Sequence, residues 1–489
     1  MASQSESIAH RLHGELDELI GQVREVEGQQ PSVHATEEQL WRGMLALGQG
    51  LMQLRFEACR EAETIQAAVE VNGVSYAYQR QSGRAYVSLF GEVRVVRAYY
   101  LNAERGGLCP LDAALSLPEL SYSDSVQERL SEVNVWIPQE QSVALMERWL
   151  GLKIPKGSLQ SSSSQQALYV EDYYEQRPMG PAPVQDSILV ATADGKGIPM
   201  TGQDSPPLQA RRSKGQKKTA KKEAVVTALY SVAPYVRDSA SILAALLPDQ
   251  ETKHPQSAEA RPSPSHKQTF GTLEGKTAAL SQLAHQVARR DCPECVLRVA
   301  LTDGAEALQQ QVLDHLPDFT LVLDIIHVTE HLWEAANARW GETSPDRLPW
   351  IHQALTWLLE HQLDALLLDL QAQAAGLAVA QQQTLVRVSA YLRRNRPFMD
   401  YQRYLALGWP IGTGVVEGAC RHLVKDRFEQ AGMRWSKVGA QSLLDLRSVA
   451  FNDDWDDFHR FRRQQSHRER YDFPYPASLP DLVALEAAA

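Results

Sequence analysis

Three acidic residues lie where a folded chain could bring their carboxylates together. Asp194 follows the apolar part of SILVATADGKGIPM, Asp303 follows the apolar part of CVLRVALTDGAEAL, and each precedes a glycine. Glu417 falls in the first turn of a helical pattern that follows the glycine-rich segment 412–414. Converging carboxylates repel one another unless a divalent cation neutralises them, and Mg²⁺ or Mn²⁺ prefers oxygen ligands. We therefore expect a metal site at these acids, with Mg²⁺ or Mn²⁺ as its cofactor.

Only the fold could unite these acids, because they are distant in sequence. Their separations are 303 − 194 = 109 and 417 − 303 = 114 residues. The two apolar runs are typical of buried strands, and acids just past strand ends lie where open α/β sheets bind ligands. Each acid alone has an ordinary explanation, since Asp-Gly is a common turn and a helix dipole favours an early glutamate. The strand, strand, helix order of the three favours one shared site.

Three further residues are secondary candidates for this site. Asp324 and His327 lie in FTLVLDIIHV, which we expect to form a strand over 319–328. Asp324 could replace Asp303 as the second acid, although an acid within an apolar run looks less like a strand-end ligand. His327 could contact a phosphate or the leaving group, or it could be a hydrogen-bonded structural histidine. Trp435 could stack on an unpaired base or belong to the core.

Clusters of cations accompany these positions, although the whole chain carries a net charge of −11. Nucleic-acid binding requires local positive charge, so the total does not exclude it. Segment 211–222 holds seven Lys or Arg and no acid, and smaller clusters occupy 391–397 and 459–470. A basic run is also typical of a solvated surface, and Arg421 could instead form an i,i+4 ion pair with Glu417. The candidate DNA-binding residues are Arg211, Arg212, Lys214, Lys217, Lys218, Lys221, Lys222, Arg421 and Lys425.

The N-terminal part is predicted to be mainly helical with one β-hairpin. Residues 1–68 show helical spacing, 69–100 are patterned as strands with a hairpin around Phe90, and 101–117 form a loop. Three short helices follow within 118–170, with Gly151 in the turn before the third. Their spacing resembles a DNA-binding helix-turn-helix, and a plain helical bundle is the alternative.

Residues 171–450 are predicted to form an α/β catalytic domain. A linker over 171–185 leads to a strand that ends at Asp194, and further strands are expected at 222–232, at 266–273, before Asp303 and at 319–328. Helices are expected on either side of the Asp303 strand. Residues 331–407 show only helical patterning, which predicts an all-helical insertion before Glu417. The remaining residues, 451–489, form a basic C-terminal segment and tail.

The motifs ADGKGIPM, TDGAEAL, LDIIHVTEHLWEAANA and GWPIGTGVVEGACRHLVKDR together resemble the DDE insertion-sequence transposases of the ISKra group. The resemblance covers roughly residues 171–450, and the last motif is long and specific. It implies a ribonuclease H-like core in which Asp194, Asp303 and Glu417 are catalytic and bind two metal ions. It also implies cleavage at element ends, strand transfer into target DNA, and homo-oligomers assembled on DNA.

The composition predicts a cytoplasmic protein with no membrane partner, and the resemblance implies that it is prokaryotic and nucleoid-associated. The 489 residues are 44% hydrophobic, and no apolar run approaches the ~20 residues of a membrane span. The five cysteines fit a reducing compartment, and the single CxxC pair at 292 and 295 is interpreted as a turn. Two alternatives stay open: a catalytically decayed DNA-binding relative, and a metal-dependent nuclease of ribonuclease H-like fold.

Overall fold

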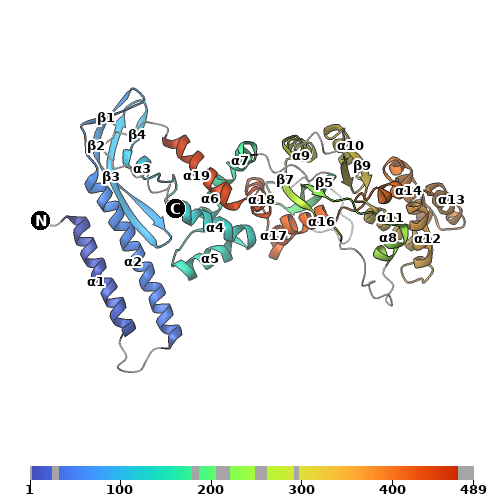
Figure 1. Cartoon of the computed structure of the whole chain (residues 1–489), viewed down its shortest axis with the longest axis horizontal. Helices are drawn as coiled ribbons and strands as arrows, with labels where there is room; N and C mark the ends of the chain where they lie inside the picture. Colours follow the sequence, from blue (N-terminus) through green and yellow to red (C-terminus); the bar gives the residue numbers. More distant parts are fainter. Residues whose placement is uncertain are drawn as a thin grey trace. The chain divides into compact units, whose positions relative to one another are not determined.

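The computed structural model describes residues 3–24, 32–178, 187–204, 221–247, 261–290 and 297–471 (Figure 1). The fold is mixed α/β and divides into two compact units. The N-terminal unit comprises Met1–Glu175 together with Asp454–Ala489, and the central unit comprises Gln176–Asp453. None of the described helices is both long and apolar enough to span a membrane.

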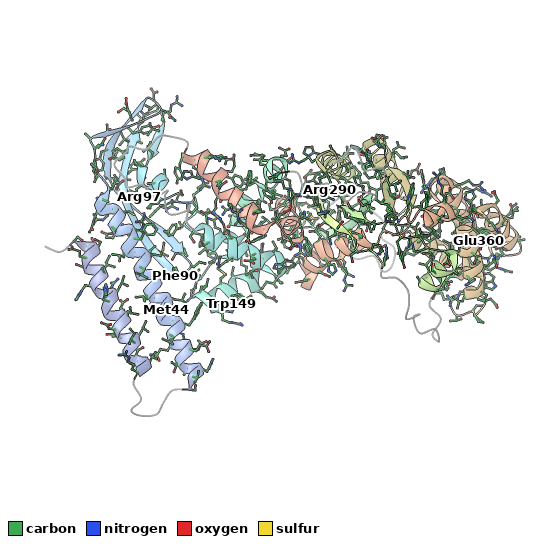
Figure 2. All side chains as sticks on the ribbon, viewed as in Figure 1. Met44, Phe90, Arg97, Trp149, Arg290 and Glu360 are labelled. Atoms are coloured by element: carbon green, nitrogen blue, oxygen red, sulfur yellow. The ribbon has the colours of Figure 1, made fainter. Side chains whose placement is uncertain are left out.

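The N-terminal unit begins with a helical hairpin and a four-stranded antiparallel sheet. The predicted turn at Phe90 is present, because Ser88 pairs with Gly91 across it. The predicted loop over 101–117 is wrong, since it contains a strand and a short helix. The buried Arg97 donates its Nε–H to Asp112 at 2.6 Å and so fastens that helix to the sheet (Figure 2). The elements are α1 (Gln4–Arg24), α2 (Val33–Ala62), β1 (Ala68–Val71), β2 (Val74–Ser88), β3 (Gly91–Asn102), β4 (Gly106–Leu108) and α3 (Pro110–Ala114).

Three short helices, a further helix that continues into the predicted linker, and the C-terminal helix complete this unit. Gly151 ends the second of the three in the left-handed conformation, with φ 69°, where glycine carries no steric cost. Leu130, Met146 and Leu159 form the apolar core between them. The predicted linker is helical as far as Gln176. The elements are α4 (Asp124–Trp136), α5 (Gln139–Leu150), α6 (Lys156–Ala167), α7 (Val170–Gln176) and α19 (Trp455–Tyr471).

The central unit is built on a five-stranded mixed sheet in the order β7-β6-β5-β8-β9. β6 is antiparallel to β5 and β7, whereas β8 and β9 run parallel to β5. All five predicted strands are present. The strands are β5 (Ile188–Pro199), β6 (Lys221–Val232), β7 (Ser265–Thr272), β8 (Leu297–Thr302) and β9 (Thr320–Leu323).

Helices cover both faces of this sheet. One face buries Leu189 and Ala191 against α9 (Lys276–Arg290) and α10 (Glu306–His315). The other buries Ile188 and Val190 in a core shared with the helical region that follows β9. α8 (Ser239–Leu246), between β6 and β7, contributes to the same core. The region after β9 and the C-terminal helices of the unit are α11 (Ile325–Trp340), α12 (Arg347–Leu359), α13 (Leu363–Ala374), α14 (Val379–Asn395), α15 (Tyr401–Ala406), α16 (Gly414–Ala419), α17 (Asp426–Phe428) and α18 (Lys437–Phe451).

Two strand boundaries differ from the prediction. The strand expected over 319–328 ends at Leu323, because Asp324 caps the N-terminus of α11 by accepting the Ile326 N–H at 2.8 Å. The helical insertion therefore begins at Ile325 rather than at residue 331. β5 does not end at Asp194 but continues to Pro199, because β6 pairs with it along its whole length.

Candidate functional site

Three aspartates lie at the same level across the three parallel strands. Thr192 pairs with Leu301, and Thr302 pairs with Leu323. Asp194 and Asp303 each follow the first pair by two residues, so they lie opposite each other. Asp303 and Asp324 each follow the second pair by one residue, so they also lie opposite each other. The carboxyl edge of an open sheet is where α/β proteins bind ligands. The register therefore gives Asp324 the strand-end position that its place in the sequence did not suggest.

Backbone contacts bring the Glu417 helix to the same edge. The Ile325 N–H donates to the Ile411 carbonyl at 2.9 Å, which places segment 411–413 beside the end of β9. The buried Thr413 then precedes α16, whose first turn carries Glu417. In the sequence, Thr413 is recognisable only as part of a turn, and its position between Gly412 and Gly414 is the one signal of a close backbone approach.

Thr413 contacts two carboxylates with a single hydroxyl. Its Oγ1 lies 3.0 Å from Oε1 of Glu417 and within hydrogen-bond distance of Oδ2 of Asp324. A hydroxyl has one proton, so it can donate to only one of these acids at a time. One of the two carboxylates therefore lacks a hydrogen bond from Thr413 at any moment, and a cation bound between the acids would compensate their negative charge.

Asp324 is fully buried and closely held. Besides the Ile326 N–H and Thr413, it contacts Nδ1 of His327 through Oδ2 at 3.0 Å. This hydrogen bond, together with the charge of Asp324, raises the pKa of His327 to about 9, against the opposing effect of burial. At neutral pH the imidazolium therefore compensates part of the charge of the buried acid.

Asp324, His327 and Glu417 each offer one ligand atom, and these atoms all lie within 4.8 Å of one another. Within the described residues this is the only such group of His, Cys, Asp or Glu. The two carboxylates and the Thr413 hydroxyl form an oxygen-rich set that suits Mg²⁺ or Mn²⁺. Because its pKa is raised, His327 is protonated at neutral pH, and it could bind a metal only after losing that proton.

Asp194 and Asp303 are near this group but outside it. Asp194 accepts the Gly195 N–H at 2.6 Å. Burial raises the pKa of the thiol of Cys420, which directly follows α16, and the charge of Asp194 raises it further. Asp303 accepts the Ala305 N–H at 2.9 Å, and its charge contributes to the raised pKa of His327. The structure thus gathers Glu417 with two of the three secondary candidates, Asp324 and His327, and leaves the predicted triad of Asp194, Asp303 and Glu417 as a prediction.

The helical insertion holds the turn that carries Asp303. Tyr391 donates its hydroxyl proton to the Asp303 carbonyl at 3.2 Å, and Arg394 donates to the Gly304 carbonyl. Gly304 has φ 87°, so the glycine of this Asp-Gly motif is needed for the backbone conformation. The sequence shows Tyr391 and Arg394 only as part of the basic cluster 391–397, because contacts over about 90 residues leave no local pattern that would predict their support of the Asp303 turn.

A π-helical segment, Cys420–Lys425, follows α16. π-Helical turns often occur at functional sites. Arg447, buried in α18, donates its Nε–H to the Leu423 carbonyl at 2.7 Å and also donates to the His422 carbonyl. It therefore satisfies carbonyls within the wide turn and fixes the segment next to Glu417.

The cations and the tryptophan of this segment differ in exposure. Arg421 and Lys425 are exposed, and the ion pair of Arg421 is with Asp426 at 3.9 Å rather than with Glu417. Trp435 is buried and donates its indole N–H to the Phe428 carbonyl at 3.2 Å. The burial of Trp435 supports a packing role rather than base stacking.

The structure describes only part of the predicted basic clusters, and several of their cations form ion pairs within the chain. Residues 211–218 lie outside the described residues, as do Cys292 and Cys295, whereas Lys221 pairs with Glu429 and Lys222 is partly exposed. In the C-terminal cluster, Arg462 is buried and pairs with Asp124 at 2.8 Å.

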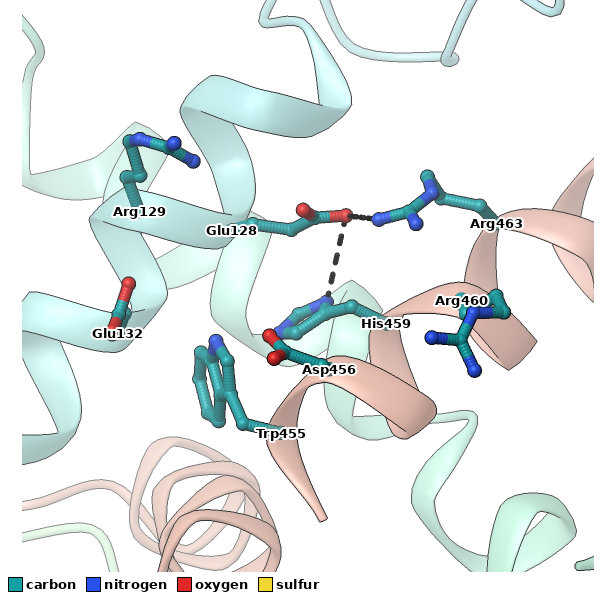
Figure 3. Close-up of a pocket in the computed structure, with 8 residues that line it drawn as sticks. All are labelled: Glu128, Arg129, Glu132, Trp455, Asp456, His459, Arg460 and Arg463. Carbon is teal, nitrogen blue, oxygen red and sulfur yellow. Dashed lines mark hydrogen bonds and ion pairs between the residues drawn. The ribbon is translucent and has the colours of Figure 1, made fainter. Parts of the chain in front are cut away.

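The C-terminal cluster lines a pocket of about 490 Å³ between α4 and α19, in which Arg463 pairs with Glu128 (Figure 3). Arg460, in the same pocket, pairs with Asp457 at 2.7 Å. These arginines compensate acids of their own unit, which leaves them less available to bind phosphate than the sequence implied.

Comparison with known proteins adds no assignment: no protein-family model matches the chain, and no curated protein is similar to it.

Proposed function

We propose that the central unit is the catalytic core of a divalent-metal-dependent DNA transposase with a ribonuclease H-like fold. The observation that carries the proposal is the pair of acids, Asp324 and Glu417, that share the Thr413 hydroxyl at the carboxyl edge of the sheet. Asp194 within β5 and Asp303 after β8 lie at the same level of the sheet as Asp324, which supports including them in the site. Such a concentration of acids is suited to holding metal ions against a phosphodiester.

The order of elements supports the ribonuclease H-like assignment. Three strands, a helix, a strand, a helix and a strand follow one another from Ile188 to Leu323, as the resemblance to the transposases implies. The first strand is central, and the later two extend the sheet in parallel on its far side. The helical region between β9 and α16 corresponds to the insertion that the resemblance implies before Glu417.

Each side chain of the site has a stated task in this proposal. Asp324 and Glu417, with Asp194 and Asp303, would hold Mg²⁺ or Mn²⁺, which when bound activates water or a 3′-hydroxyl and stabilises the leaving oxygen. Thr413 orients the first two carboxylates, and His327 compensates the charge of Asp324. The exposed Arg421 and Lys425 would contact phosphates of the bound strand.

The test is cleavage and joining of a labelled DNA that carries the element's own end, in Mg²⁺ or Mn²⁺. We expect nicking and strand joining with the wild type, and a loss of about 100-fold or more with Glu417→Gln while DNA binding persists. The matched control is Glu342→Gln, which removes a charge from an exposed glutamate without a hydrogen bond or ion pair in the described structure. Cleavage that survives Glu417→Gln would contradict the assignment.

The same assay separates the alternatives. Metal-dependent cleavage without joining would favour a nuclease of similar fold. Binding without cleavage by the wild type would favour a non-catalytic DNA-binding relative.

A further inference from the structure

The α1–α2 hairpin is an incomplete helical bundle. Within α1, all of which the structure describes, Leu12 is the only buried side chain. Leu12 packs on Gly50 and Leu19 packs on Gly43, because a Cβ at either glycine would lie about 2.4 Å or less from the leucine methyl. These contacts define an antiparallel pair in which residue 12 faces residue 50 and residue 19 faces residue 43.

Exposed apolar side chains collect on one flank of this pair. At about 100° per residue, Leu16 and Ile20 lie roughly 40° and 80° from the face of α1 that meets α2. Met44 and Leu51 lie roughly 80–100° from the face of α2 that meets α1. In antiparallel right-handed helices, rotation in the same sense leads to the same side of the pair. The four side chains, which are 40, 42, 54 and 52% exposed, therefore share one flank.

Charged residues border this flank in a self-complementary order. Glu6 and Arg24 both lie roughly 120° round α1 from its contact with α2, and Glu37 and Arg55 lie at the same angle on α2. Each helix thus carries an acid near its N-terminus and a cation eighteen residues later on the outer rim. None of these four residues has an ion-pair partner among the described residues. A second hairpin laid antiparallel on the flank would bring each acid opposite a cation.

We propose that this flank, formed by Leu16, Ile20, Met44 and Leu51, is the docking surface for a second copy of the chain. Two hairpins related by a two-fold axis perpendicular to their helices form a four-helix bundle, in which α1 packs on the partner's α1 and α2 on the partner's α2. Glu37 then faces the partner's Arg55. Such an interface is isologous, since both copies use the same surface.

The dimensions of the hairpin agree with a stable dimer. The 21 residues of α1 extend about 30 Å, and two packed helices are about 20 Å wide. The flank therefore offers roughly 600 Å² per copy, near the ~800 Å² that each partner contributes to an interface of standard size. Single exposed apolar residues are normal on a protein surface, but a continuous apolar stripe with a charged rim is typical of an interface.

The test is the mass of the full-length chain without DNA, measured by light scattering or sedimentation over a range of concentrations. We expect a concentration-dependent dimer for the wild type. Met44→Glu and Leu51→Glu place a charge in the centre of the flank, and we expect each to raise the dimer dissociation constant at least about 30-fold. Leu368→Glu is the matched control, because Leu368 is 68% exposed in the other unit. Circular dichroism of each variant checks that the helices remain folded.

Charge reversal tests the antiparallel arrangement separately. Glu37→Arg places like charges opposite each other and is expected to weaken the dimer, and adding Arg55→Glu is expected to restore it. A wild type that stays monomeric at every concentration would overturn the proposal and show that the flank is covered within the chain or by another molecule. A dimer that persists in both apolar variants, or a double reversal that restores nothing, would also overturn it. None of these readouts depends on catalysis.

Discussion

At the scale of single residues, Thr413 is the side chain on which the candidate site depends most directly. Its one hydroxyl proton lies between two acids from different elements, Asp324 after β9 and Glu417 in α16. Asp324 was discounted in the sequence because Ile325 and Ile326 extend the apolar run and imitate a continuing strand. The capping hydrogen bond that ends the strand depends on Asp324 itself. The residue types were thus visible in the sequence, but their assignment required the boundary between strand and helix.

Thr413→Val is expected to reduce metal-dependent cleavage by about 10- to 100-fold, the usual effect of losing a group that orients metal ligands. Thr413→Ser keeps the hydroxyl and is expected to retain most activity. The measurement is single-turnover cleavage at several Mn²⁺ concentrations. Equal rates for Thr413→Val and the wild type would show that the hydroxyl does not orient the acids.

At the scale of elements, all five strands of the central sheet were predictable, four of them from apolar runs that buried strands need whatever their neighbours. The π-helical segment could not be predicted, because its hydrogen-bond register depends on Arg447, which lies 24 residues after Leu423. Burial lowers the pKa of Arg447 to about 9, and the nearby charge of Arg427 contributes to that lowering. The hydrogen bonds that Arg447 donates to the Leu423 and His422 carbonyls therefore offset the cost of burying its guanidinium.

Arg447→Met should leave those carbonyls without donors and should lower the free energy of unfolding by about 2–4 kcal/mol. Urea denaturation measures this change, with the exposed Arg421→Met as control, for which we expect less than about 0.5 kcal/mol. A comparably small effect of Arg447→Met would mean that the π-helical segment keeps its conformation without the hydrogen bonds of Arg447.

At the scale of the whole molecule, the chain enters the central unit once and then returns to the N-terminal unit through α19. Net charge and local basic runs did not predict this return. The sequence shows 459–470 as a local basic cluster, which is compatible with nucleic-acid binding or with a solvated surface, whereas Arg462 and Arg463 pair with acids of α4. Charge in a sequence does not distinguish a cation that faces solvent from one that faces an acid 338 positions away.

The return of α19 also buries His459, whose pKa is lowered to about 2 by burial and by Arg462 and Arg463. Its Nδ1 accepts a hydrogen bond from Arg462 at 3.3 Å, so the ring is neutral. The unfolded chain takes up a proton below about pH 6.5 and the folded chain does not, so stability falls on acidification. The expected loss from this residue is about 1 kcal/mol between pH 6.5 and 5.5.

Chemical denaturation of the N-terminal unit at several pH values measures this dependence. In His459→Leu, the slope of the free energy of unfolding against pH is expected to fall by the equivalent of about one proton. The exposed His10→Gln is expected to leave this slope unchanged. An unchanged pH dependence in His459→Leu would show that His459 titrates normally in the folded state.

The position of α19 in the chain has a consequence for the order of synthesis. Asp124 and Glu128 are translated more than three hundred residues before the arginine that pairs with both of them. While the ribosome makes the intervening residues, α4 has no C-terminal partner and the first unit stays open. All residues of the central unit are therefore translated before α19, so the contacts that close the N-terminal unit cannot form until the central unit has been synthesised.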